Sequence, residues 1–199
     1  MRAAASMARG PAPSLKARAL QWLTQREHSR VELRRKLLGH VRLRDAARAA
    51  AADANGDTLA DPGRAPECEE RSAAAVRAKA AAEVDSLLDW LQAERHLSDA
   101  RFVESRVNAC SARYGNRRIQ QELKQHGTAL DEAGQAQLKA SEMLRARTLW
   151  QRRFGHVANT PGDAAARARQ MRFLAARGFS FDVIQRVLRA PIDDEEALA

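Results

Sequence analysis

The sequence of 199 residues predicts an all-α protein in which small helical units stack into an elongated array. Apolar residues recur at helical spacing, as in the stripe formed by Val84, Leu87, Leu88 and Leu91. No segment alternates apolar and polar residues with the period of two that is typical of a β-strand. A helix-end signal also recurs along the chain. These three observations favour helices throughout.

The repeated signal is a leucine followed eight residues later by an aspartate. It occurs in LQAERHLSD (91–99), LKQHGTALD (123–131) and LAARGFSFD (174–182), and LLGHVRLRD (37–45) fits the same frame. Each segment reads as the end of a helix, a short turn and the start of the next helix. Small helical hairpins cannot bury their apolar faces alone, so we expect them to stack on their neighbours in an elongated array.

The first helical repeat is predicted over residues 15–42, after a flexible N-terminus of residues 1–14. Two apolar stripes support it, and they consist of Leu15, Ala19, Trp22 and Leu23 and of Leu33, Leu37 and Val41. Between the stripes, Ser29 and Glu32 have the spacing of a capping box, in which the serine hydroxyl accepts the N–H of the third helical residue. A helix should therefore begin directly after Ser29.

The second repeat is predicted over residues 76–127 and the third over residues 128–190. Their apolar faces include the stripe of residues 84–91, a second of Phe102, Val103, Val107 and Cys110, and a third of Ile119 and Leu123. Ser98 and Ser180 are candidate helix caps. Gly127 and Gly178 follow predicted helices where a left-handed residue ends a helix, so both should adopt positive φ.

Residues 43–75 differ from the rest of the chain, because they are rich in alanine and carry seven acidic residues against four arginines. They contain almost no large hydrophobic residue, so we expect a disordered acidic insertion, with frayed helix at its two ends. Residues 191–199 add four acidic residues and are predicted to form an acidic tail.

The whole chain is basic, with 34 Lys and Arg residues, 25 Asp and Glu residues and a net charge of +9. This balance favours an anionic partner, such as nucleic acid or an acidic protein surface, although solvated basic faces without a partner remain an alternative. Cys68 and Cys110 do not form a disulfide framework. No secretory signal and no apolar run of membrane-spanning length is visible, so we expect a cytoplasmic protein that does not enter a membrane.

No set of residues in the sequence predicts catalysis. P-loop, GxGxxG and HExxH motifs are absent, no CxxC pair suggests zinc, and no two histidines are four residues apart. Asp131 and Glu132 are explained by the start of a helix, where carboxylates complement the helix dipole. We therefore expect no enzyme, no cofactor and no metal. Cys110 and the three tryptophans are interpreted as core residues.

Four segments resemble, in the correct order, the successive motifs of the RecX family of regulatory proteins. They are LKARALQWLTQREHSRVELRRKL (15–37), LLDWLQAERHLSDARFVESRV (87–107), RYGNRRIQQELKQHG (113–127) and RQMRFLAARGFSFDVIQRVLR (169–189). The resemblance implies a tandem array of three-helix repeats. It also implies a protein that binds the RecA filament and inhibits its strand exchange, ATP hydrolysis and coprotease functions. We expect the chain to be a monomer. The chain departs from the family in its long segment 43–75 and in Val41, where the other hairpins are expected to have glycine.

Basic residues outside the predicted core are the candidates for contact with RecA or DNA. Within RYGNRRIQQELKQHG, a helix that starts near Asn116 would bury Ile119 and Leu123 and leave its cations exposed. The candidates are Arg34, Arg35, Lys36, Arg113, Arg117, Arg118, Lys124, Arg152 and Arg153. A sequence-independent DNA-binding protein is the alternative function, because basic helical hairpins would serve either purpose. Direct DNA contact within a complex with RecA stays open.

Overall fold

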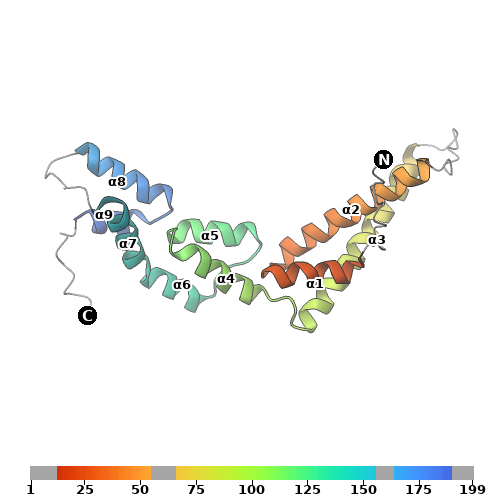
Figure 1. The fold of residues 1–199 in the computed structure, drawn as a ribbon, viewed down its shortest axis with the longest axis horizontal. Coiled ribbons are helices and arrows are strands. Elements are labelled where there is room, and N and C mark those ends of the chain that lie inside the picture. Colours follow the sequence, from red (N-terminus) through yellow and green to blue (C-terminus); the bar gives the residue numbers. More distant parts are fainter. Residues whose placement is uncertain (1–12, 55–65, 156–163, 190–199) are drawn as a thin grey trace, which may run out of the picture. The chain divides into compact units, whose positions relative to one another are not determined.

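The computed structural model describes residues 13–54, 66–155 and 164–189, and these residues form nine α-helices and no strand (Figure 1). The chain divides into two compact units, residues 1–98 and residues 99–199. The first unit holds α1 (Leu15–Gln25), α2 (Arg30–Ala54) and α3 (Pro66–Ala93). The second unit holds α4 (Asp99–Ser111), α5 (Asn116–Gln125), α6 (Glu132–Ala140), α7 (Glu142–Phe154), α8 (Ala164–Ala176) and α9 (Phe181–Arg189). The prediction of an all-α fold is confirmed.

The core of the first unit is made by the stripes that the sequence indicates. Its buried residues come from all three helices and from the turn after α3, and they are Leu15, Ala19, Leu33, Leu37, Val41, Val84, Leu88, Leu91 and Leu97. Trp22 and Trp90 are half-buried against this cluster. The capping interaction also forms, since the N–H of Glu32 donates to the Ser29 hydroxyl at 3.1 Å.

The helix end that we predicted at residues 37–45 is wrong, because α2 continues without a break to Ala54. In the repeated frame, Val41 occupies the position that must turn left-handed, and a β-branched residue strongly disfavours that conformation. Val41 instead lies buried in the helix interior, 4% exposed. The residues that follow are mostly alanine and arginine, which have high helix propensity and allow the helix to continue.

Residues 43–75 were predicted to be a disordered insertion with frayed helix at its two ends. The structure has helix over residues 43–54, in α2, and over residues 66–75, in α3, and residues 55–65 lie outside the described residues. The boundary between the first two repeats also differs from the prediction. We placed residues 76–93 at the start of the second repeat, but α3 packs along α2 in the first unit (Figure 1). In the structure, the apolar stripe of residues 84–91 is buried against α1 and α2. The sequence pattern shows that this face of the helix is buried, but it does not identify the helices that cover it. The predicted N-terminal residues 1–12 and tail 191–199 lie outside the described residues.

Two apolar clusters form the core of the second unit. Helices α4, α5 and α6 bury Phe102, Cys110, Ile119, Leu123 and Leu138. Helices α7, α8 and α9, with the turn before α9, bury Ala146, Trp150, Leu174, Phe179, Ile184 and Val187. The burial of Ile119 and Leu123 is as predicted, and Trp150 is a core residue whose Nε1 donates to Gln170 Oε1 at 3.0 Å.

The repeated frame is confirmed at its other three positions, where three helices end in the same way. In each, the carbonyl of a buried leucine accepts the N–H of the residue five or six places later, and the residue four places after the leucine is left-handed. The three pairs are Leu91 with Arg95 at φ 58°, Leu123 with Gly127 at φ 68° and Leu174 with Gly178 at φ 83°. Arg95 is the non-glycine member of this set.

We expect Gly127→Val to lower the free energy of unfolding by about 1–2 kcal/mol, because a β-branched residue is strained at positive φ. Arg95→Gly should act in the opposite direction and stabilise the first unit, since glycine removes the same strain. Arg95→Ala is the matched control, because it removes the arginine side chain but keeps a Cβ at the left-handed position. Denaturant melts test all three variants. Equal stability of Arg95→Gly and Arg95→Ala would contradict the strain argument.

Candidate interaction surface

The first turn of α5 is held by the turn that joins α8 to α9. The N–H of Gly115 donates to the carbonyl of Arg177 at 2.9 Å, and the N–H of Arg117 donates to the carbonyl of Gly178 at 3.1 Å. The start of a helix leaves its first N–H groups without partners inside the helix. Here the α8–α9 turn supplies an acceptor within that first turn, and the start of α5 packs directly on this turn.

A buried carboxylate completes this junction. Glu142, at the first position of α7, is 4% exposed and accepts hydrogen bonds from the N–H of Asn116 at 3.2 Å and the N–H of Ser180 at 3.2 Å. The Ser180 hydroxyl, a predicted cap, lies 3.4 Å from the other oxygen of Glu142. These contacts place one negative charge at the N-terminal ends of both α5 and α9, where the helix dipole favours it.

Arg145 of α7 makes further hydrogen bonds to the segment that precedes α5. Its guanidinium donates to the carbonyl oxygens of Tyr114 at 2.8 Å, Leu138 at 3.0 Å and Ser111 at 3.3 Å, and to Asn116 Oδ1. Burial lowers the pKa of Arg145, and the nearby Glu142 carboxylate opposes that shift. The segment between α4 and α5 is thus fixed to α7 by a charged side chain that satisfies several backbone carbonyls.

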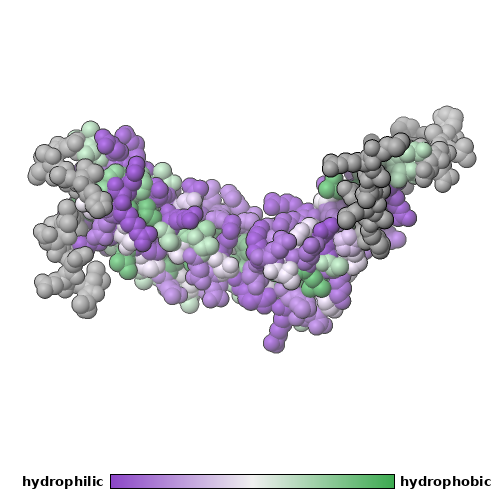
Figure 2. Space-filling view, in the orientation of Figure 1, coloured by the Kyte–Doolittle hydropathy of each residue, from purple (hydrophilic) through white to green (hydrophobic). Residues whose placement is uncertain are grey.

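This junction shapes an open basic groove of about 1030 Å³ with walls from α4, α5 and α8. Its charged residues are Arg106, Arg113, Arg117, Arg118 and Glu122. Arg106 pairs with Glu122 at 2.6 Å, so three arginines remain in excess, and Arg118 lies over the Tyr114 ring at 4.4 Å. On the face shown in Figure 2, hydrophilic side chains predominate over α5. The groove is suited to an anion or to an acidic surface.

Cys110 lines this groove and is 8% exposed. Burial raises the pKa of its thiol, and the contact with Glu122 Oε2 at 3.3 Å raises it further. A thiol with a raised pKa is a poor nucleophile. The interpretation of Cys110 as a small core residue is consistent with this placement.

Three of the nine candidate cations, Arg113, Arg117 and Arg118, are brought together in the basic groove. Lys124 is exposed on α5, and Arg152 and Arg153 are exposed in the last turn of α7. The remaining three, Arg34, Arg35 and Lys36, lie on α2 in the first unit. The basic groove also contains Arg106, which sequence reasoning missed, although its position one turn before Cys110 places the two on one face of a helix.

Two of the candidates on α2 are engaged within the first unit. Arg34 makes two hydrogen bonds to Asp85, at 2.6 and 2.9 Å, which raise the pKa of Arg34 and lower that of Asp85. Lys36 Nζ lies 3.9 Å from Glu32 and 5.5 Å from the centre of the Trp22 ring. Arg35 is exposed. Among these three, Arg35 is the residue that is best placed for an external contact.

Across the residues that the structure describes, no group of three or more His, Cys, Asp or Glu side chains is arranged to hold a metal ion. None of the described helices is long and apolar enough to cross a membrane.

Comparisons with known proteins find the same family along most of the chain. Residues 98–136 match the second three-helix domain of RecX, and residues 141–188 match its third three-helix domain. The regulatory protein RecX of Ralstonia nicotianae is 42% identical, over 91% of this chain and 92% of the relative. That of Leptothrix cholodnii is 41% identical, over 90% of each chain. The crystal structure of RecX from Lactobacillus salivarius has a similar fold, with a TM-score of 0.52, 15% identity and coverage of 87% of this chain and 92% of that chain.

Proposed function

The chain belongs to the RecX family, and we propose that it binds the filament of the RecA recombinase and restrains its strand exchange, ATP hydrolysis and coprotease activity. The observation that carries the proposal is the basic groove, in which three arginines in excess are held on a hydrogen-bonded junction. In this proposal the protein acts as a cytoplasmic monomer and performs no catalysis of its own.

The groove offers the chemistry that such a filament requires. A recombinase filament on DNA presents protein carboxylates and DNA phosphates, and the guanidinium group binds both with paired hydrogen bonds. The groove is open rather than enclosed, which suits a large surface better than a small molecule. Lys124, Arg152, Arg153 and Arg35 are exposed elsewhere and add further sites. Several weak contacts along one filament give a high overall affinity.

Sequence-independent binding to DNA alone is the second candidate function. The same arginines would contact phosphates, which fix position on DNA but carry no sequence information. This alternative predicts that DNA alone binds in the basic groove, and that the protein binds DNA with the same affinity whether or not the recombinase is present.

Binding measured across a salt series separates the two functions. We expect the protein to bind preformed RecA filaments on single-stranded DNA more tightly than the same DNA without recombinase. We also expect a weaker dependence of filament affinity on salt, because contacts with protein release fewer counterions than contacts with phosphates. Equal affinities and equal salt slopes for filament and bare DNA would instead favour the DNA-binding protein.

A further inference from the structure

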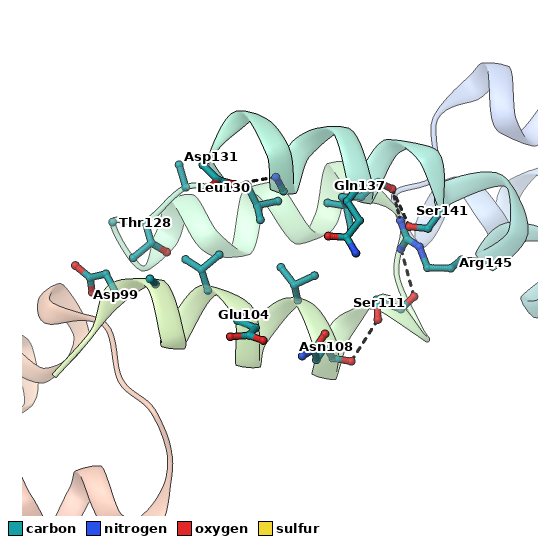
Figure 3. Close-up of a pocket in the computed structure, with 17 residues that line it drawn as sticks. Asp99, Glu104, Asn108, Ser111, Thr128, Leu130, Asp131, Gln137, Ser141 and Arg145 are labelled. Carbon is teal, nitrogen blue, oxygen red and sulfur yellow. Dashed lines mark hydrogen bonds between the residues drawn. The ribbon is translucent and has the colours of Figure 1, made fainter. Parts of the chain in front are cut away.

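A second groove lies on the same unit, between α4 and α6, and has a volume of about 800 Å³ (Figure 3). Its apolar lining comes from α4, from α6 and from the segment before α6, and consists of Ala100, Val103, Val107, Ala129, Leu130 and Leu138. The groove has a different lining from the basic groove, and no residue is shared between them.

Two valines of this groove pack against the core of α4, α5 and α6 with only part of their surface. Phe102, Val103, Val107 and Cys110 lie on one apolar stripe of α4, but the structure divides them. Phe102 and Cys110 are buried, at 1% and 8% exposure. Val103 and Val107 are half-buried and line the open groove, one helical turn apart. Contact with a further apolar side chain would remove this surface from water.

The rim of the groove is acidic. Asp99, Glu104 and Asp131 line it, and Figure 3 shows Asp99 and Asp131 near one end and Glu104 along α4. The one cation in the lining, Arg145, is at the other end, and its guanidinium is engaged by backbone carbonyls. The charged residues that line this groove are thus mostly acidic, whereas the chain as a whole has a net charge of +9. Phosphates and acidic surfaces are disfavoured here.

We propose that this α4–α6 groove docks an apolar segment of the recombinase that also carries Lys or Arg. One or two aliphatic side chains of that segment pack against Val103 and Val107, and its cation lies beside Glu104. Charge complementarity favours a basic protein segment over DNA, because the acidic rim repels phosphates and attracts cations. The proposed function names the recombinase as the protein that supplies this segment. An apolar groove that receives a few anchoring side chains is a common mode of peptide recognition. The inference rests on the proposed function and assigns a second contact to it.

Charge reversal at the rim tests the proposal. Glu104→Lys combined with Asn108→Lys should weaken binding to RecA filaments by about tenfold or more, because it places repulsive charges at the docking site. The same variant should bind bare single-stranded DNA as tightly as the unmodified protein or more tightly, since it gains positive charge. Opposite effects on the two ligands distinguish a protein contact from a general effect of charge.

Glu83→Lys combined with Ser86→Lys is the matched control, because it makes the same change of charge at exposed positions of α3. It should keep filament affinity within about twofold. Circular dichroism melts establish that both variants are folded. Filament affinity of the Glu104 variant that equals the control's would overturn the groove proposal and leave the proposed function intact. If the unmodified protein fails to bind filaments, both proposals are overturned.

A photo-crosslinking residue, p-benzoylphenylalanine, placed at Asn108 identifies the occupant directly. Asn108 is exposed and lines the groove, so the probe lies within reach of any docked segment. A product with the recombinase subunit, formed on filaments, is the expected result. A product that joins two copies of this chain, a crosslink within one chain, or labelling of DNA alone would overturn the assignment of the groove to a recombinase segment.

Discussion

Replacing Arg117 and Arg118 together by glutamate is expected to remove most of the inhibition of RecA ATP hydrolysis. Both side chains are exposed and line the basic groove. The four arginines of the groove outnumber its one glutamate, Glu122, and after the double substitution three glutamates outnumber the two remaining arginines. The net charge of the groove therefore changes from positive to negative. A desolvated charge pair at an interface contributes a few kcal/mol and a pair at its rim far less. The size of the defect therefore reports how deeply the two arginines are buried in the complex.

The fold should survive this double substitution. Both residues lie in the first turn of α5, where carboxylates complement the helix dipole and cations oppose it. The contact of Arg118 with Tyr114 is lost, but it lies at the protein surface, where such contacts contribute about 0.5–1 kcal/mol. We expect an unchanged circular dichroism spectrum and a melting temperature within a few degrees of the original.

Arg169→Glu with Arg172→Glu is the matched control for this experiment. These residues are exposed on α8, do not line the basic groove and undergo the same change of charge. The control variant should retain most of its inhibition. If the two variants inhibit equally, the effect depends on total charge alone, and Arg117 and Arg118 are ordinary solvated residues on a basic protein.

Local signals predicted the parts of the fold that depend on a few neighbouring residues. The left-handed glycines, Gly127 and Gly178, were predicted because each follows a leucine by four residues at the end of a predicted helix. The end of α2 was predicted wrongly because the leucine was present while Val41 cannot turn left-handed. Steric exclusion at that one position outweighed the match to the repeat.

The junction beneath the basic groove could not be predicted in the same way. Glu142 contacts residues 26 and 38 positions away, and in the sequence it has the appearance of an ordinary acidic residue in the first turn of a helix. Arg145 was likewise indistinguishable from the other arginines of a basic chain. The chemistry of both residues depends on which helix ends meet, and that is decided by packing between distant segments.

Gly115→Ala tests this junction and should destabilise the second unit by about 1–3 kcal/mol or more. The φ of Gly115 is −80°, which any residue adopts, so the cost comes only from space. A Cβ at this position would lie 2.3 Å from the backbone nitrogen of Phe179 and 2.4 Å from the carbonyl oxygen of Gly178. Backbone atoms cannot rotate away as a flexible side chain can, so α5 must separate from the α8–α9 turn, and overpacking of this kind costs up to several kcal/mol.

Gly39→Ala provides the opposite result in the first unit. A Cβ at Gly39 meets no atom within 4 Å, and the residue lies inside α2, where alanine is favoured over glycine by about 0.5–1 kcal/mol. Thermal melts should therefore show a large loss of stability for Gly115→Ala and a small gain for Gly39→Ala.

The Gly115 variant, held folded at low temperature, should also inhibit RecA poorly, because Arg117 and Arg118 move with α5. Unchanged stability and inhibition would mean that α5 is not seated on the α8–α9 turn, and the basic groove would lose one of its walls.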